Sequence, residues 1–438
     1  MYALIDGNTF YASCERVFQP ELNGKPVVVL SNNDGCIVTL TKEAKILGLR
    51  RGTPIFKVRD LIEANDVRVF SSNYELYGDM SARMMKTIAS LVPAIEPYSI
   101  DECFADVAGM PNLTQLGLAI RQRVAQWTGI PTCVGIAPTK TLAKFCNHLA
   151  KRYPKLEGVL NWNDLTPERR MKALASEPVS EVWGIGSRLT ERLNRLGVRT
   201  AADLARCSLE RLAAHFPVTL LKTVRELQGV ESIDFVPEPE VRQQIVRSRS
   251  FAADVSDRDA VRAAVIEHAH EAAAVLRREG LVAHTLSVFL YSNPFKPEAG
   301  VHFGQDAVAF GCAINDTTSI VREAARLVKR IHKAGVGYKK AGVMLGGIEP
   351  TEQATRDLFA SIECERNDRL SATLDRINAR WGKGAVCAGI VRLSDQSWRM
   401  KRDRLSRAYT TRLSDLLQVG ELKREKAVAR SPKDPVKQ

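Results

Sequence analysis

The sequence has no apolar run that approaches the ~18 residues needed to cross a membrane. Its first residues also lack the charged region, the apolar stretch and the small-residue cleavage site of a secretory signal peptide. Nine cysteines occur, but none forms a C-x-x-C pair, so neither a structural zinc site nor a disulfide scaffold is expected. These absences predict a cytosolic protein whose cysteines are small buried hydrophobic side chains.

The composition is that of a basic, multi-domain protein. Of the 438 residues, 45% are hydrophobic, which is enough for packed cores and for about three domains. The net charge is +13, and residues 366–438, with 18 basic and 8 acidic side chains, supply +10 of it. Such a region is either a solvated surface or a surface for nucleic acid, where Lys and Arg release counterions from phosphates. Residues 426–438 lack periodicity and are predicted to be disordered.

The pattern of elements predicts an α+β protein with several domains. Short apolar runs and helical repeats alternate up to about residue 160, with carboxylates at strand ends, which indicates a core with its chemistry on one sheet face. Residues 166–229 show helical patterns throughout and predict a separate helical domain. The sequence Pro237-Glu238-Pro239-Glu240 marks a linker. Residues 244–345 then follow a β-α-β-β-α-β pattern, a sheet with two helices on one face.

Three carboxylates form the most informative group. Asp6 ends an apolar strand, and Asp101 and Glu102 follow each other at a turn between two β runs. Adjacent side chains on a strand point to opposite faces, so both can serve one site only if the backbone bends there. Clustered carboxylates need cations, and their oxygens suit Mg²⁺, two of which promote phosphoryl or nucleotidyl transfer. The alternative is structural: Asp6 caps the next helix, and the other two form a solvated turn.

Several lysines could accompany these carboxylates. A triphosphate needs several cationic contacts, and helices at the rim of the sheet could supply them. For Lys140 and Lys144, the sequence favours the ordinary alternative of a solvated helix face. The lysines are Lys42, Lys45, Lys140, Lys144 and Lys151.

Two further groups could contact DNA. The hairpin with Gly184 and Gly186 could bring backbone N–H groups close to a phosphate, or could merely end a helix. Arg247 and Arg249 alternate on one predicted strand, so they face the same side of the sheet. They could follow a phosphate backbone or form a charged, solvated strand edge.

Six motifs, in this order, resemble those of the Y-family translesion DNA polymerases of the UmuC type, the catalytic subunit of bacterial DNA polymerase V. The resemblance extends from Met1 to about Val419. The motifs occupy residues 10–15 (FYASCE), 26–36 (PVVVLSNNDGC), 71–77 (SSNYELY), 98–102 (YSIDE), 182–186 (VWGIG) and 409–412 (YTTR).

The resemblance implies the right-hand architecture of a polymerase, with a little-finger domain of β-α-β-β-α-β pattern. The implied parts are a palm (1–11 and 78–163), fingers (12–77), a helical thumb with a helix-hairpin-helix (164–232), a linker (233–243), a little finger (244–350) and a UmuC-type C-terminal region (351–425).

The resemblance also implies roles for individual residues. Asp6, Asp101 and Glu102 would bind two Mg²⁺ ions, with the Gly7 carbonyl as an additional ligand. Tyr11 would be the steric gate, whose ring fills the space that a ribose 2′-hydroxyl needs. The alternative for Tyr11 is a core aromatic side chain, which its polar neighbours in the sequence disfavour.

Further implied positions concern the triphosphate and the sliding clamp. Lys45 and Lys151 match triphosphate-binding positions, whereas Lys42 stands where many relatives carry Tyr. Leu358 and Phe359 match the apolar end of the clamp-binding motif, but the Gln that leads the motif is absent, which implies weak clamp binding.

The function that follows is template-directed, error-prone DNA synthesis opposite damaged bases, in DNA repair and the SOS response. A primer 3′-hydroxyl would attack the α-phosphate of a deoxynucleoside triphosphate. The implied partners are primer-template DNA, the nucleotide, a processed UmuD-like dimer, RecA and the sliding clamp. A non-catalytic DNA-binding repair scaffold is the main alternative, but it would have no reason to keep a costly acidic cluster. A nucleotide cyclase is a third interpretation, and it would not need the helical domain, the second sheet or the basic tail.

Overall fold

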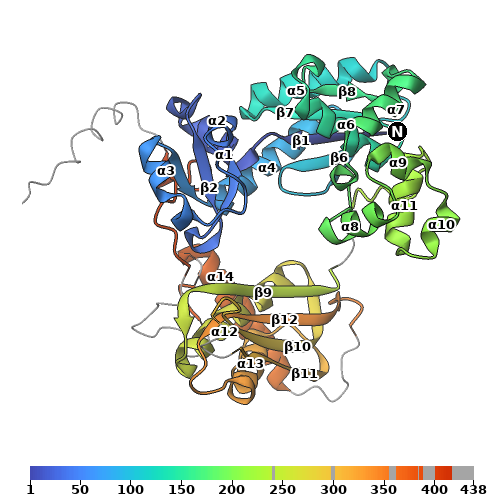
Figure 1. Cartoon of the computed structure of the whole chain (residues 1–438). Coiled ribbons are helices and arrows are strands. Elements are labelled where there is room, and N and C mark those ends of the chain that lie inside the picture. Colours follow the sequence, from blue (N-terminus) through green and yellow to red (C-terminus); the bar gives the residue numbers. More distant parts are fainter. Residues whose placement is uncertain (239–241, 297–300, 355–361, 383, 388–399, 417–438) are drawn as a thin grey trace, which may run out of the picture. The chain divides into compact units, whose positions relative to one another are not determined.

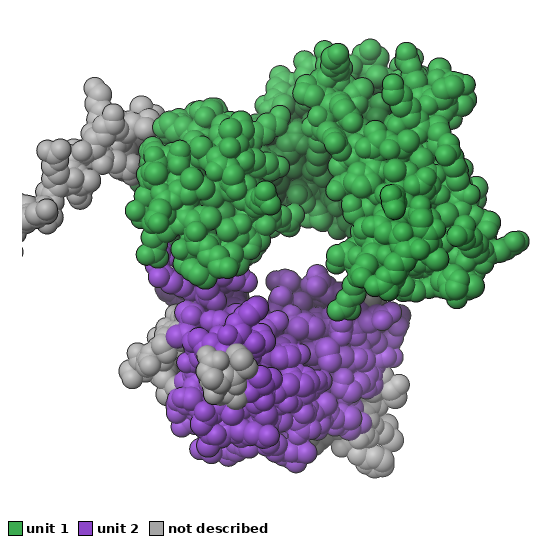
Figure 2. All heavy atoms as spheres, viewed as in Figure 1, with its two compact units in different colours: residues 1–31, 36–239, 404–438 green, residues 32–35, 240–403 purple. Residues whose placement is uncertain are grey.

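The computed structural model describes residues 1–238, 242–296, 301–354, 362–382, 384–387 and 400–416 (Figure 1). The chain forms two compact units, which Figure 2 shows in different colours. Unit 1 comprises residues 1–31, 36–239 and 404–438, and unit 2 comprises residues 32–35 and 240–403. The chain therefore passes from one unit to the other at four places.

A five-stranded sheet is the centre of unit 1, and β1 (Tyr2–Gly7) is its middle strand. The order is β5-β6-β1-β7-β8, and β1 is antiparallel to both β6 and β7. The other strands are β5 (Ala94–Pro97), β6 (Glu102–Asp106), β7 (Thr132–Ala137) and β8 (Val159–Asn161).

Each face of β1 packs into a different apolar core, as the two-residue period of a strand requires. Ala3 and Ile5 join the core that contains α1 (Phe10–Phe18), α4 (Tyr74–Ala89) and α5 (Leu113–Thr128). Leu4 faces the other way, toward α6 (Lys140–Arg152). Asp6 continues the face of Leu4, so its carboxylate lies on the α6 side of the sheet.

A smaller sheet follows α1, with the order β3-β2-β4. The strands β2 and β3 pair antiparallel, while β4 is parallel to β2. Its elements are β2 (Val27–Leu30), β3 (Ile37–Leu40), α2 (Lys42–Ile46), α3 (Arg59–Ala64) and β4 (Arg68–Ser71).

Residues 166–229 are helical, as the sequence predicts. Their apolar side chains share one core with those of α6, so this segment packs as a part of unit 1. Its helices are α7 (Pro167–Ser176), α8 (Ser187–Arg195), α9 (Ala201–Arg206), α10 (Leu209–Ala213) and α11 (Val218–Leu227).

Unit 2 contains the predicted β-α-β-β-α-β pattern. The strands form an antiparallel sheet with the order β11-β10-β12-β9, and the core lies between this sheet and two helices, α12 and α13. The elements are β9 (Gln244–Val255), α12 (Arg258–Arg278), β10 (Leu281–Ser292), β11 (Phe303–Ile314), α13 (Thr317–Ile331), β12 (Tyr338–Pro350) and α14 (Ile362–Trp381).

The helices and the cysteines of the described residues can be compared with the sequence analysis. None of the helices there is both long and apolar enough to cross a membrane. The described cysteines are free thiols. Those at positions 14, 103, 133 and 146 are buried as expected, whereas those at 36, 207, 312 and 387 are partly exposed.

Candidate active site

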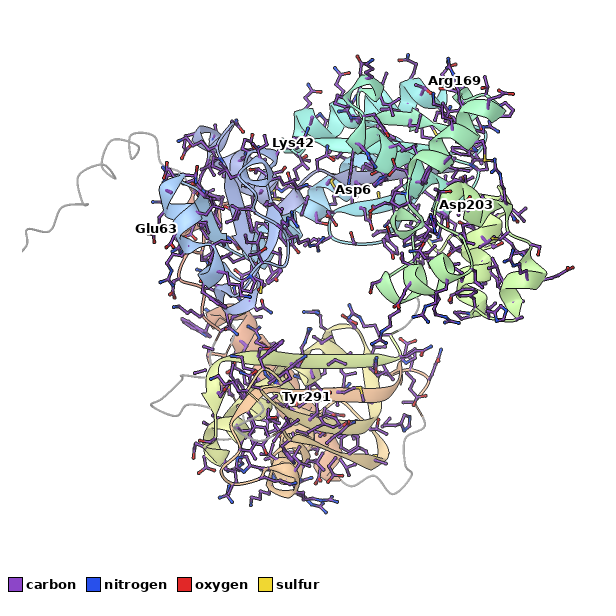
Figure 3. All side chains as sticks on the ribbon, in the orientation of Figure 1. Asp6, Lys42, Glu63, Arg169, Asp203 and Tyr291 are labelled. Atoms are coloured by element: carbon purple, nitrogen blue, oxygen red, sulfur yellow. The ribbon has the colours of Figure 1, made fainter. Side chains whose placement is uncertain are left out.

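The pairing of β1 with β6 places two carboxylates side by side. Asp6 lies directly opposite Glu102 in the antiparallel register, and residues opposite each other project from the same face. This is the face that α6 covers, because Leu4 and Phe104, the next pair on the same face, belong to the α6 core. Figure 3 labels Asp6 at this position. The sheet register therefore brings together two of the three carboxylates, Asp6 and Glu102.

A backbone bend brings in the third carboxylate, as the sequence argument requires. Residues 99–101 form a bend before β6 begins, so Asp101 does not continue the alternation of the strand. The backbone N–H of Gly7 donates to the Asp101 carbonyl (2.7 Å), which fixes Asp101 at the end of β1. The Ser99 hydroxyl donates to Asp101 Oδ1 (2.6 Å) and orients the carboxylate.

Two lysines of α6 face these carboxylates. Lys151 Nζ lies 2.5 Å from Asp6 Oδ1, and Lys144 Nζ lies 2.7 Å from Glu102 Oε1. These lysines are seven residues apart, which puts them on the same side of a helix. The expectation of a solvated helix face is therefore wrong for Lys144. Lys151, predicted to meet a triphosphate, lies at the carboxylate site.

The solvated-face expectation is also wrong for Lys140. This side chain is 1% exposed, and its ammonium lies 2.5 Å from Glu96 Oε2. The cause is tertiary packing: α6 is buried around most of its circumference, so its lysines must find partners in the sheet and its surroundings.

The neighbouring charges act on Asp6. The pKa of Asp6 is raised to about 6: burial is the largest cause, Lys151 lowers the pKa, and the negative charges of Asp101 and Glu102 raise it by smaller amounts. Negative charge is therefore concentrated at this end of β1, and the lysine ammonium groups compensate part of it.

The donor chemistry of the site fits a hard divalent cation. Carboxylate and carbonyl oxygens are the ligands that Mg²⁺ prefers. As the side chains stand, no three His, Cys, Asp or Glu residues in the described part of the chain are arranged to hold a metal ion. The oxygens of Asp6 and Glu102 face lysines instead, so a cation here would compete with Lys151 and Lys144 for them.

Tyr11 lies close to this site and is only partly buried. Its ring stacks on Tyr77, with 4.5 Å between the centroids and 15° between the planes, and meets Tyr74 edge-on at 6.2 Å. Burial raises the pKa of Tyr11, and the charges of Tyr74 and Asp101 add to this, whereas Arg51 lowers it. Tyr11 is thus a braced side chain within electrostatic reach of the carboxylates, and Arg51 is a nearby cation that the sequence analysis missed.

Lys42 and Lys45 lie elsewhere in unit 1. Both are exposed on α2, beside the small sheet, and Figure 3 labels Lys42. Within the described residues, no hydrogen bond or ion pair joins either of them to the carboxylates.

The glycine hairpin contributes a tryptophan that the sequence analysis did not single out. Trp183 Nε1 donates to the Tyr98 hydroxyl (3.3 Å), and the Lys144 ammonium lies 4.6 Å from the Tyr98 ring and 5.4 Å from the Trp183 ring. Gly184 has φ +84°, which favours glycine, whereas Gly186 precedes α8 with open space where a side chain would begin. The hairpin thus reaches Glu102 through Lys144. Two quoted motifs, YSIDE and VWGIG, contain these aromatics and were the available signal.

In unit 2, Arg247 and Arg249 share one face of β9, as predicted. Their partners on β12 are the buried residues Val343 and Ala341, so this is the face that the helices cover. Arg249 Nη2 lies 3.8 Å from the carboxylate of Glu271 on α12. The arginines are therefore at the edge strand and on the helix side of the sheet. Leu358 and Phe359 lie outside the described residues.

Comparison with solved structures identifies the class of fold. The Y-family DNA polymerase chimera Dbh-Dpo4(243-245)-Dbh aligns with a TM-score of 0.63 over 80% of this chain and 99% of that chain, at 22% identity. The α+β architecture described above is therefore that of the Y-family DNA polymerases.

Sequence comparisons give the particular family. Residues 5–148 match the impB/mucB/samB family, residues 242–358 match its C-terminal domain, and residues 368–419 match a domain of unknown function (DUF4113). Protein ImpB of Salmonella typhimurium is 42% identical over 95% of this chain and 99% of its own length. Protein UmuC of Salmonella typhimurium (strain LT2) is 43% identical over 96% and 100%. The chain belongs to the impB/mucB/samB family, and within the Y family it is UmuC-like.

Proposed function

We propose that Asp6, Asp101 and Glu102 are the catalytic residues with which this chain carries out DNA synthesis. As a UmuC-like member of its family, the chain is a translesion DNA polymerase, which extends a primer opposite damaged template bases. The observation that carries the residue assignment is the register of Asp6 with Glu102, together with the hydrogen bond that fixes Asp101 at Gly7. No feature of the site favours a non-catalytic scaffold.

The carboxylates would hold two Mg²⁺ ions, with the Gly7 carbonyl as an additional ligand. When bound, the ions would activate the primer 3′-hydroxyl and neutralise the charge that develops on the triphosphate. The chain's own part is to supply clustered carboxylates on a rigid sheet, so that little reorganisation is needed. Burial and mutual repulsion, which raise the pKa of Asp6, make this cluster a favourable place for a cation.

Lys151 and Lys45 are proposed to bind the triphosphate of the incoming nucleotide. Lys151 already lies at Asp6, and its flexible side chain can turn from the carboxylate to a phosphate oxygen. Lys45 is exposed on α2 and would approach from the small sheet. Lys144 would keep Glu102 in place by the same kind of ion pair.

Tyr11 is proposed to be the steric gate against ribonucleotides. Its ring is partly exposed, is braced by Tyr77 and lies within electrostatic reach of Asp101. A rigidly held ring beside C2′ of the incoming sugar would collide with a 2′-hydroxyl.

The remaining assignments follow the family. The five-stranded sheet would be the palm (1–11 and 78–163), the small sheet the fingers (12–77), the helices of 164–232 the thumb, and residues 244–350 the little finger. Gly184, Gly186, Arg247 and Arg249 would contact DNA. Residues 351–425 would form the C-terminal region, in which Leu358 and Phe359 would bind the sliding clamp. A processed UmuD-like dimer and RecA are proposed as further partners, besides primer-template DNA and deoxynucleoside triphosphates.

The proposal is tested by primer extension on a lesion-bearing template with the full chain, its UmuD-like and RecA partners, and Mg²⁺. Asp101→Ala is expected to reduce nucleotide incorporation by at least about a hundredfold, or ~3 kcal/mol of barrier, and to leave DNA binding nearly unchanged. The control is Asp79→Ala, which removes a carboxylate of an exposed ion pair with Arg83. Equal activity of Asp101→Ala and the unmodified chain would refute the assignment.

A further inference from the structure

The chain returns to unit 1 after unit 2, and residues 404–416 are the last part that the structure describes. We call residues 404–416 the C-terminal strap; the strap lies in the dark red part of the chain in Figure 1. It falls within residues 368–419, the region that matches the domain of unknown function. The contacts of the strap within unit 1 indicate what this part of the region does.

The strap begins with hydrogen bonds to the last residue of β4 and to the residue that caps α4. Ser71 N–H donates to the Arg404 carbonyl (2.9 Å), and Arg404 N–H donates to Ser71 Oγ (3.0 Å). Asn73 is 3% exposed, and its Nδ2 donates to the carbonyl of Ser406 (3.1 Å) and to its hydroxyl (3.0 Å). The other amide atom, Oδ1, accepts from Leu76 N–H (3.3 Å) at the start of α4. Asn73 thus joins the strap to the N-terminus of α4.

An aromatic contact holds the next part of the strap. The ring of Tyr409 stacks on Phe18 at the end of α1, with 4.8 Å between the centroids and 7° between the planes. Tyr409 is 8% exposed and Ala408 6%, so this part of the strap is buried on unit 1. Ala408 N–H donates to Asp415 Oδ2 (2.9 Å), which closes the strap on itself. The strap is therefore attached to both α1 and α4.

Between these two attachments, the strap reaches a buried carboxylate. Ser406 Oγ donates to Glu15 Oε1 (2.9 Å), and the Tyr77 hydroxyl donates to the same oxygen (2.6 Å). Glu15 and Tyr77 have no exposed surface. Glu15 stands one helical turn after Tyr11 on α1, and the ring of Tyr77 is the one on which Tyr11 stacks.

We propose that the C-terminal strap positions the ring of Tyr11 through Ser406, Glu15 and Tyr77, and thereby sets how strictly the polymerase excludes ribonucleotides. The inference rests on the proposed function in one respect, namely the role of Tyr11 at the incoming sugar. Ser406, Glu15 and Tyr77 are positioning residues, since they act through Tyr11. Tyr11 can exclude a 2′-hydroxyl only if its ring is held in place. If the ring on which it stacks could rotate, Tyr11 would move aside and admit the ribonucleotide.

Three of the six motifs that carried the family resemblance meet at this point. Glu15 belongs to FYASCE, Asn73 and Tyr77 belong to SSNYELY, and Tyr409 belongs to YTTR. The metal and nucleotide sites use Tyr11 of the first motif but no residue of the other two. Positioning of Tyr11 gives SSNYELY and YTTR a common role.

The test compares discrimination between deoxynucleotides and ribonucleotides in the full chain with its partners and Mg²⁺. The ratio of kcat/KM for a dNTP to that for the matching rNTP is measured on one primer-template. Ser406→Ala and Tyr77→Phe, each of which removes one hydroxyl from Glu15, are expected to lower this ratio by about tenfold. Ser406→Thr, which keeps the hydroxyl, is expected to retain it. Ser414→Ala, at an exposed serine of the same strap, is the matched control.

The ratio is independent of the folded fraction, because both substrates are measured on one preparation. Loss of activity with an unchanged ratio in Ser406→Ala and Tyr77→Phe would show a merely structural strap and overturn the inference. Tyr11→Ala distinguishes a failure of the inference about the strap from a failure of the gate assignment of Tyr11. If Tyr11→Ala lowers the ratio and the strap variants do not, only the inference fails. If Tyr11→Ala leaves the ratio unchanged, the gate assignment in the proposed function fails, and the inference fails with it.

Discussion

The ammonium group of Lys140 lies 2.5 Å from Oε2 of Glu96, and both side chains are largely removed from solvent. The same lysine donates to the Asp234 carbonyl (2.5 Å), and the same carboxylate oxygen accepts from Val236 N–H (2.8 Å). One ion pair therefore joins α6, the edge strand β5 and the segment after α11. These three parts of unit 1 are far apart in the sequence.

Lys140→Met is expected to lower the free energy of unfolding by about 3–5 kcal/mol, because it leaves Glu96 without its cation. Urea denaturation of the variant and the unmodified chain measures this. Lys140→Met combined with Glu96→Gln should recover part of the loss, since no unpaired charge remains. Lys172→Met, at an exposed lysine of α7, is the control. A loss below about 1 kcal/mol for Lys140→Met would mean that the pair contributes no more than an exposed one.

Glu15 is expected to make stability depend on pH. Burial raises the pKa of Glu15 to about 7, although hydrogen bonds from Tyr77 and Ser406 act in the opposite direction. Its Oε2 has no hydrogen-bond partner in the described part of the chain. Between pH ~4.5 and ~7 the unfolded chain releases this proton while the folded chain keeps it, so stability falls as pH rises, by about 3 kcal/mol in total.

Glu15→Gln removes this titration, so its free energy of unfolding should rise relative to the unmodified chain as pH increases from about 4.5 to 7. Urea denaturation at a series of pH values gives the difference directly. For Glu63→Gln, at an exposed carboxyl group on α3, the free energy of unfolding should change with pH as it does in the unmodified chain. Parallel curves for Glu15→Gln would contradict the raised pKa.

Lys151→Met is expected to raise KM for the incoming nucleotide by about tenfold or more, on the scale of one lost charge-assisted hydrogen bond. The reason is that the ammonium beside Asp6 is the cation already placed at the carboxylate site. Steady-state kinetics with the full set of partners measure KM. Lys155→Met, at an exposed lysine four residues further along, should behave like the unmodified chain. An unchanged KM in Lys151→Met would remove this lysine from the nucleotide site.

Replacing both Arg247 and Arg249 by Ala is expected to flatten the salt dependence of DNA binding by about one unit of slope. Each lost phosphate contact removes roughly 0.9. Arg249 should contribute little, because its guanidinium already faces Glu271 on α12. Affinities at several salt concentrations give the slope, with Arg326→Ala on α13 as the control. An unaltered slope would mean that neither arginine contacts a phosphate and that both only form a charged strand edge.

Much of unit 2 could be predicted from the sequence, because its periodicity and stop signals are strong. The helical repeat and the stop signal Gly280 predict a helix over residues 257–279, and the structure has α12 at Arg258–Arg278. The apolar run at residues 307–310 predicts a short strand there, and the structure has the longer strand β11, Phe303–Ile314. Gly304, Gln305 and Asp306 precede this run and Gly311 follows it in the sequence, and pairing with β10 extends the strand in both directions.

The orientation of charged side chains could be predicted only in part. Alternation shows that Arg247 and Arg249 share a face, but the buried partners Val343 and Ala341 decide which face it is. Similarly, α6 is buried nearly all round, so no polar side was available to which Lys140 and Lys144 could be assigned. For both groups, tertiary packing supplies the information that a local pattern lacks.

The cluster of Asp6, Asp101 and Glu102 could be predicted, because a backbone bend and the pairing of two neighbouring strands bring the three carboxylates together. The contact of Ser406 with Glu15 was not, because 391 residues separate them. Neither side chain stands out in its own segment, since a buried glutamate in a helix and a serine in a basic region have no distinctive spacing. Only the folded chain shows that they are neighbours.

Because residues 404–416 return to unit 1, the group proposed to select the sugar, Tyr11 with its supports Glu15, Tyr77 and Ser406, is not encoded by one continuous stretch of sequence. A recombination event after Glu238 would exchange nearly all of unit 2 and the strap together. The product would combine the Glu15 and Tyr77 of one parent with the Ser406 of another. In such a recombinant, sugar selectivity would depend on how well the strap of one parent fits the Glu15 and Tyr77 of the other. The three carboxylates and Lys151, in contrast, would all come from one parent.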